Sequence, residues 1–268
     1  MRQCARLIML TAATFLGRAG SADAEALNPR EIMERVDARD DGDNSTQDME
    51  MILIDRNGGE RVRNLRVFGR DEGKDEYSIM FFLTPADVKD TGFLTYDYRD
   101  PSRDDDQWLY LPALKRTKRV ASSDKSGSFM GSDFSYADMT KRPLDDYQYT
   151  LMGETEIEAQ SVWQIEAVPT TDREKDETGY EKFQTFVRKD NYVVVRGVYW
   201  VKKGGRLKYY DVRKLERIDG IWVATEMDMT TKQGTETLHK TVLHVRNVRF
   251  NQALPSDLFT VRRLEKGP

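Results

Sequence analysis

The chain has 268 residues, of which 33% are charged and 38% hydrophobic, and its formal net charge at pH 7 is −4. This negative balance argues against a nucleic-acid-binding protein, because phosphate backbones are bound mainly by Lys and Arg. The length is sufficient for one large β domain.

Residues 1–24 are typical of a cleaved secretory signal peptide. Arg2 and Arg6 precede a short apolar run at 7–16, which is too short to cross a bilayer, and a small-x-small cleavage pattern follows it. Cys4 is the only cysteine. We therefore expect residues 25–268 to form an exported, soluble, cysteine-free single domain that is periplasmic in a Gram-negative source.

One helix is predicted at the start of the mature chain. Asn28 can cap it, Pro29 suits the first helical position, and Ile32, Met33 and Val36 form a short apolar stripe. An acidic loop follows this helix.

The rest of the chain is predicted to be β structure almost throughout, because short runs of apolar and β-branched residues alternate with turn residues. A first series of strands is expected at 46–55, 60–69, 76–83, 92–98, 107–111 and 115–120. A second series is expected at 147–153, 161–169, 181–188, 193–201, 206–217, 221–230 and 237–249. Residues 172–178 are expected to form an exposed loop.

Two of these strands, 77–83 and 193–200, are apolar on both faces, the second apart from Arg196. An antiparallel sheet usually leaves one face to water. Both faces are therefore expected to be covered, by a helix, by the other side of a closed sheet or by a bound lipid.

The segment 108–139 differs from the rest of the chain. It begins as an aromatic strand, continues through a basic run and crosses a Ser/Gly-rich loop with large apolar side chains. These loop side chains, Phe129, Met130, Phe134 and Tyr136, are expected to be exposed, because such a loop has no periodic core face to join. The pattern indicates a lid or mouth over an apolar site.

No enzyme template fits the sequence. The nearest match to a GxSxG nucleophile motif has Phe129 at the nucleophile position, and the sequence contains no phosphate-binding GxGxxG or P-loop pattern. His239 and His244 are five residues apart on a predicted strand, so they are expected to face opposite sides. We predict no catalytic residue, no metal site and no cofactor.

The remaining signal is apolar and basic. The candidates for an apolar cavity or lid are Trp108, Tyr110, Phe129, Met130, Phe134, Tyr136, Met139, Phe81 and Met227. Ordinary core packing is the alternative for each of them. The candidates for contact with an acidic partner or with lipid phosphates are Lys115, Arg116, Lys118 and Arg119, for which the solvated face of an edge strand is the alternative.

The run LPALKRTKRV followed by GSFMGSDFSYADM resembles the outer-membrane lipoprotein-sorting protein family of the LolA/LolB superfamily. This resemblance extends over essentially the whole mature chain. It implies a mainly β fold with a few helices (α+β), in which helices and a lid loop cover an incomplete antiparallel β-barrel, or half-barrel. It also implies that Arg63 or Arg66 matches a functional arginine facing the cavity, and that residues 255–259 lead into a last strand.

The same resemblance implies a non-enzymatic periplasmic carrier for a lipid or an acylated lipoprotein. Such a carrier would receive its cargo from an inner-membrane transporter of the RND/MMPL type, and it could pass the cargo to an outer-membrane acceptor. An accessory subunit that docks on the exporter without carrying cargo is the alternative. A hydrolase that depends on carboxylates is a third hypothesis.

Overall fold

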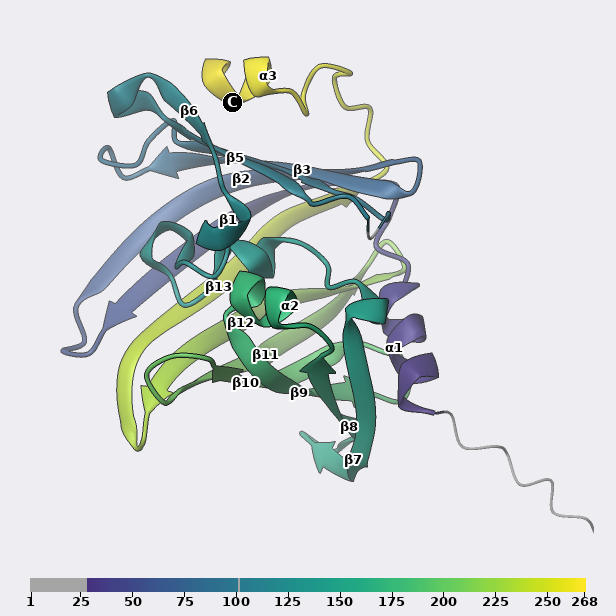
Figure 1. The fold of residues 1–268 in the computed structure, drawn as a ribbon. Coiled ribbons are helices and arrows are strands. Elements are labelled where there is room, and N and C mark those ends of the chain that lie inside the picture. Colours follow the sequence, from purple (N-terminus) through teal and green to yellow (C-terminus); the bar gives the residue numbers. More distant parts are fainter. Residues whose placement is uncertain (1–27, 101) are drawn as a thin grey trace, which may run out of the picture.

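The computed structural model describes residues 28–100 and 102–268, so the expected signal peptide at 1–24 and Cys4 lie outside it. The described chain forms one open sheet of 13 antiparallel strands, with three α-helices and several short 3-10 turns (Figure 1). The mainly β class and the half-barrel expected from the resemblance are confirmed.

The strands are β1 (Asn44–Asp55), β2 (Glu60–Glu72), β3 (Asp75–Thr84), β4 (Gly92–Asp97), β5 (Asp106–Leu111), β6 (Arg116–Arg119), β7 (Tyr147–Ile157), β8 (Gln160–Pro169), β9 (Tyr180–Arg188), β10 (Val194–Val201), β11 (Arg206–Ile218), β12 (Ile221–Gln233) and β13 (Glu236–Phe250). The helices are α1 (Pro29–Asp37), α2 (Asp172–Thr178) and α3 (Val261–Lys266). Every predicted strand has a counterpart here, and the predicted first helix is α1.

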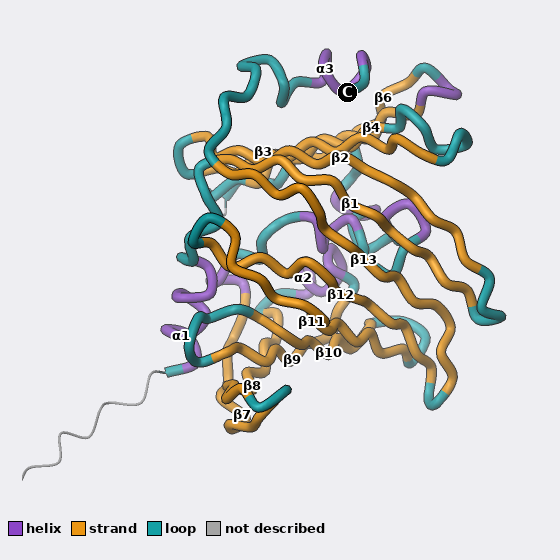
Figure 2. Tube along the Cα trace, turned by 180° about the vertical axis from the view of Figure 1, so that it is seen from behind, coloured by secondary structure: helices purple, strands orange, loops and turns teal. Residues whose placement is uncertain are grey.

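The strand order is β6-β5-β4-β3-β2-β1-β13-β12-β11-β10-β9-β8-β7. Neighbours in the sheet are therefore neighbours in the chain, except that β1 pairs with β13. The long strands twist, and register shifts in β1, β10 and β11 increase the curvature, so the sheet forms a trough (Figure 2). The two edge strands, β6 and β7, follow one another in sequence but lie at opposite ends of the sheet.

The segment after β13 covers the outer face of the sheet at β3 and β4. Ile79 and Phe81 on β3 pack there against Leu258, Phe259 and Leu264, while Phe82 on the same strand belongs to a separate cluster inside the trough. This arrangement explains why the strand is apolar on both faces.

The expectation that residues 255–259 lead into a last strand is wrong, because they lead into α3. Thr260 caps this helix by accepting a hydrogen bond from the Arg263 amide, and Leu264 is fully buried. Gly92 on β4 allows the close approach, since a Cβ atom there would lie 2.6 Å from a Leu264 methyl group. The α3 segment pairs with no strand, and its contact with the sheet is made by apolar side chains.

The expectation of a loop at 172–178 is also wrong. Thr171 caps α2 by accepting from the Glu174 amide, and Gly179 ends it in the left-handed conformation. These two terminal signals offset the weak apolar character of the helix. No helix in the described part of the chain has the length and apolarity that a bilayer crossing requires.

The contact of α3 with the sheet can be tested by shortening one side chain. Leu264→Ala should lower the free energy of unfolding by about 2–5 kcal/mol, because it leaves a cavity between α3 and β4. The same substitution at Leu114, which is 67% exposed, should change it by less than about 0.5 kcal/mol. Urea denaturation measures both values, and equal effects would contradict the packing described here.

Candidate functional site

Residues 120–146, called the plug below, connect β6 to β7 and lie inside the trough (Figure 1). They contain the 3-10 turns η2 (Ser122–Asp124), η3 (Phe129–Gly131), η4 (Tyr136–Met139) and η5 (Leu144–Asp146). The plug adds no strand to the sheet, and its one isolated β-bridge joins its own residues Ser128 and Ser135. It is therefore held by side-chain packing and by individual hydrogen bonds.

Aromatic side chains of the plug fill the interior. Phe129 is 1% exposed, and its ring centre lies 5.0 Å from that of Phe93 and 5.5 Å from that of Tyr136. Phe134 is buried as well. The expectation that these loop side chains are exposed is wrong, because the loop folds back on itself through a 2.8 Å hydrogen bond from the Phe129 amide to the Phe134 carbonyl and directs both rings into the core.

The candidate apolar residues divide between the two faces of the sheet. Those that pack in or against the interior cluster are Phe129, Met130, Phe134, Tyr136, Met139 and Met227. Those that pack in or against the outer cluster beneath the C-terminal segment are Phe81, Trp108 and Tyr110. Alternation along a strand causes this division, since Leu109 points inward while its two neighbours point outward.

Asp133 attaches the plug to β12 and β13. Its carboxylate is nearly fully buried and accepts hydrogen bonds from Thr231 Oγ1 at 2.5 Å and Thr241 Oγ1 at 2.7 Å, while His239 Nδ1 lies 2.7 Å from Oδ2. The Asp133 amide also donates to Thr241 Oγ1 at 3.0 Å. Four contacts thus hold this one residue against the sheet.

Asp138 forms a second attachment, to β9. It accepts hydrogen bonds from the Ser135 amide and from Tyr180 Oη, both at 2.8 Å, and from Arg142 at 2.6 Å. Burial would raise the pKa of Asp138, but Arg142, Lys208 and these hydrogen bonds outweigh it and lower the pKa. The carboxylate is therefore held in its charged form.

Arg142 is the counter-ion of Asp138 and also stacks on the interior aromatic rings. Its guanidinium carbon lies 5.0 Å from the ring centre of Phe183 and 5.5 Å from that of Tyr199. Asp133, Asp138 and Arg142 are not among the site residues predicted from the sequence. The Ser135–Asp138 capping box was a detectable signal, since it predicts a local turn that fixes Asp138.

Arg63 of β2 points into the interior and donates to the Met130 carbonyl at 2.5 Å. It is 8% exposed, and it lies 5.9 Å from the ring centre of Phe82. Arg66 forms an ion pair of 2.8 Å with Asp48 and is much more exposed. Of these two arginines, Arg63 is therefore the one that faces the interior of the sheet.

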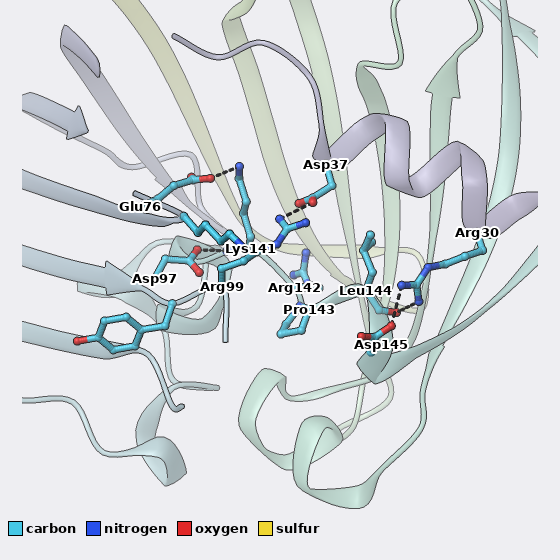
Figure 3. Close-up of a pocket in the computed structure, with 12 residues that line it drawn as sticks. Arg30, Asp37, Glu76, Asp97, Arg99, Lys141, Arg142, Pro143, Leu144 and Asp145 are labelled. Carbon is cyan, nitrogen blue, oxygen red and sulfur yellow. Dashed lines mark hydrogen bonds and ion pairs between the residues drawn. The ribbon is translucent and has the colours of Figure 1, made fainter. Parts of the chain in front are cut away.

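The end of the plug borders a polar cavity of about 120 Å³ next to α1 (Figure 3). The Lys141 amide donates to Asp97 at 2.6 Å, and Arg30 of α1 reaches the Leu144 carbonyl at 2.8 Å. Charged groups dominate this lining, so the cavity does not suit an acyl chain. With the plug in place, its own side chains occupy the apolar interior.

The basic run forms part of an edge of the sheet, as its alternative interpretation expected. Arg119 forms an ion pair with Asp106, and Lys118 Nζ lies 3.4 Å from Asp124 Oδ2. Lys115 and Arg116 are exposed at the tip of the β5–β6 hairpin, next to the exposed Leu114. This tip is the protruding part of the run.

The two histidines face opposite sides of β13, as predicted. His239 contacts Asp133 inside the trough, whereas His244 lies 2.9 Å from Glu50 on the other side. Within residues 28–100 and 102–268, no group of three or more His, Cys, Asp or Glu side chains is arranged to hold a metal ion.

The sequence and the fold are similar to those of several known proteins. A family model described as an uncharacterised protein matches residues 74–266, and the curated proteins gave no match. A solved DUF1329 family protein from Desulfovibrio piger is 32% identical, with a TM-score of 0.80 over 89% of this chain and 100% of its own. A putative outer membrane lipoprotein-sorting protein domain from Vibrio parahaemolyticus is also 32% identical, with a TM-score of 0.79 over 88% of this chain and 98% of its own.

A LolA superfamily protein from Nitrosomonas europaea is 18% identical. Its TM-score is 0.66 over 88% of this chain and 99% of its own. At this identity the likeness shows the fold alone, which is the LolA-like half-barrel.

Removing the Asp133 charge should loosen the plug. Asp133→Asn weakens the contacts to His239 and the two threonines, each worth about 0.5–1.5 kcal/mol, so amides of residues 128–139 should exchange hydrogen about tenfold faster. Hydrogen exchange read by mass spectrometry measures this. Asp124→Asn, at an exposed position in the same segment, is the matched control, and equal protection in both variants would contradict the anchoring role.

Asp97 provides a pH test. Burial, together with the charge of the nearby Asp105, raises the pKa of its carboxyl from 3.8 to about 7. The folded protein therefore binds an extra proton between these values, so this group reduces the free energy of unfolding as pH rises from about 4 to 7, by at most about 1.4 kcal/mol per pH unit.

Asp97→Asn should remove this dependence, since the amide oxygen can still accept from Lys141 but carries no charge. The variant should exceed the wild type in free energy of unfolding at about pH 8 and lose the excess at about pH 4. Urea denaturation at the two pH values measures the difference. The exposed Asp87→Asn should show no such pH-dependent gain, and an equal gain there would refute the assignment to Asp97.

Proposed function

Since the chain belongs to the DUF1329 family and has the LolA-like fold, we propose that it is a non-enzymatic carrier that holds a lipid or the acyl chains of a lipoprotein inside the half-barrel. One observation carries the proposal: the apolar interior of the sheet is filled by a segment of the same chain that contributes no strand to it. Because the plug contributes no strand, it can leave the trough without breaking any pairing of the sheet.

The energetics of exchange support this mechanism. An acyl chain gains about 0.8 kcal/mol for each CH2 group taken out of water, which exceeds 10 kcal/mol for a 16-carbon chain. Displacing the plug exposes Phe129 and Phe134, at a cost of about 1.5–3 kcal/mol for each of these buried side chains, and a smaller amount for each of the partly buried Met130, Tyr136 and Met139. A long acyl chain can therefore compensate for the apolar contacts of the plug, and the polar attachments then decide whether the interior opens.

Three interior attachments control that opening. Asp133 binds β12 and β13, Asp138 binds β9, and Arg63 of β2 binds the Met130 carbonyl. They connect the plug to both halves of the trough. In the proposed carrier, entry of cargo breaks these contacts, and release of cargo restores them.

The relatives agree with such a role, since one protein of 32% identity is named a putative outer membrane lipoprotein-sorting protein domain. The proposed location is the periplasm. The proposed partners are an inner-membrane RND/MMPL-type transporter and an outer-membrane acceptor. The exposed tip formed by Leu114, Lys115 and Arg116 is the proposed contact with an acidic partner surface or with lipid phosphates.

A second candidate function is an accessory subunit that docks on an exporter and carries no cargo. The filled interior favours it, because Phe129 and Phe134 occupy the space that an acyl chain would need. The two functions differ in one measurable property, namely whether the protein binds lipid.

The division of the candidate residues between two faces gives the test. Met227→Asp places a charge on the interior surface and should reduce lipid retained after gentle purification at least about tenfold, since a buried charge opposes an apolar ligand. Trp108→Ala alters the outer face and should change retention less than about twofold. Native mass spectrometry reads the bound lipid, and thermal unfolding confirms that each variant is folded.

Absence of lipid from the wild type, and from the Asp133→Asn variant with its loosened plug, would contradict the carrier and support the accessory subunit. Lipid lost equally in the Trp108 and Met227 variants would show that the interior is not the binding surface.

A further inference from the structure

A second cavity, of about 340 Å³, lies between the plug and one end of the trough. At this end β9, β11 and β13 begin, and β10 and β12 end. Its lining includes Ser132 and Asp133 of the plug and Tyr180, Arg206 and Lys208 of the sheet. It differs from the cavity at α1 because it adjoins the apolar interior directly. Tyr180 belongs both to this lining and to the interior core cluster.

Two cations in this lining, Lys208 and Arg206 of β11, form no ion pair with a carboxylate in the described part of the chain. Lys208 Nζ donates instead to Tyr180 Oη at 3.1 Å. On the neighbouring strand β10, by contrast, Arg196 pairs with Asp211 of β11 at 2.6 Å.

Lys208 is partly buried, and an unpaired ammonium group held away from water is costly. Burial lowers the pKa of Lys208, and the charges of Asp138 and Asp133 only partly oppose this effect. A bound anion beside Lys208 would offset that desolvation. The position is therefore suited to a ligand that brings its own negative charge.

The sheet around this cavity already binds one carboxylate, that of the plug. Thr231, Thr241 and His239 all contact Asp133, and Thr231 and His239 also line the cavity. These side chains thus form a set of donors for an anionic oxygen at the place where the plug meets the sheet.

We propose that this cavity is a head-group pocket, in which Lys208 and Arg206 bind the carboxylate or phosphate of an anionic lipid whose acyl chain enters the adjoining interior. The inference rests on the proposed carrier function and names its cargo class as an amphiphile with an anionic head. Both groups present anionic oxygens, which are the acceptors that Lys and Arg bind most strongly.

The location of the pocket couples head-group binding to opening. An anion beside Lys208 repels the Asp133 carboxylate and competes for the donors that hold it. Loss of those contacts frees the middle of the plug, so the charged end of the cargo loosens the segment that its acyl chain must displace. Binding of the head group and release of the plug are thereby coupled, so that each favours the other.

The test compares a fluorescent polyene fatty acid with its methyl ester, which differ in head-group charge and share the acyl chain. The wild type should bind the acid about tenfold more tightly, because a charge-assisted hydrogen bond is worth about 1.5–3 kcal/mol. Lys208→Met should remove this preference while leaving affinity for the ester within about twofold. Arg206→Gln, at an exposed position on the rim, should reduce the preference without endangering the fold.

Lys182→Met and Arg61→Gln are the matched controls. Lys182 is partly exposed and pairs with Glu166, and Arg61 is exposed on β2, so both lie outside the pocket lining. Both controls should keep the wild-type preference for the acid.

Equal affinity of the wild type for acid and ester would overturn the head-group pocket and leave the carrier standing. Binding of neither probe, with no lipid in native mass spectra, would instead overturn the carrier. Calorimetry with inorganic phosphate alone should show no binding at about millimolar concentration, since the acyl chain supplies most of the affinity. Phosphate binding that Lys208→Met abolishes would identify a free-anion site and overturn the head-group assignment.

Discussion

The arrangement of this protein depends on one topological constraint. The chain builds a single open sheet in which β6 and β7 are consecutive in sequence but occupy opposite edges. The connection between them, residues 120–146, must therefore cross from one edge of the trough to the other. Because the interior face of the sheet is apolar, the connection that crosses it gains most free energy by burying its own aromatic rings there.

The plug thus fills the apolar interior of the half-barrel, which is the space that a bound ligand would need. Phe129 and Phe134 supply apolar contacts that any lipid could replace, whereas Asp133 and Asp138 supply hydrogen bonds that a hydrocarbon chain cannot replace. In the proposed carrier, apolar contacts make the interior suitable for many cargoes, and the polar contacts make its opening selective. A cargo with an anionic head group could satisfy both requirements at once, which is why the pocket at Lys208 matters to the proposed function.

The outer face of the sheet is covered by another part of the chain, the segment after β13. There the C-terminal segment covers Ile79 and Phe81 through Leu258, Phe259 and the buried Leu264. The two faces of β3 are thus covered by different segments of the chain, the inner face by the plug and the outer face by the residues after β13.

The sequence by itself determined the number, order and approximate bounds of the strands, because period-two alternation and hairpin residues are local signals. It also pointed to 108–139 as the distinctive segment, and its resemblance to the lipoprotein-sorting family is confirmed by the fold. It could not decide which side of the sheet each residue of that segment would occupy. That choice separated Trp108 from Phe129, and it depends on which face of the assembled sheet the plug crosses and which face the C-terminal segment covers. The contacts of Arg63 with Met130 and of Asp133 with Thr241 likewise join residues that are 67 and 108 positions apart in the chain, and no local pattern records such partners.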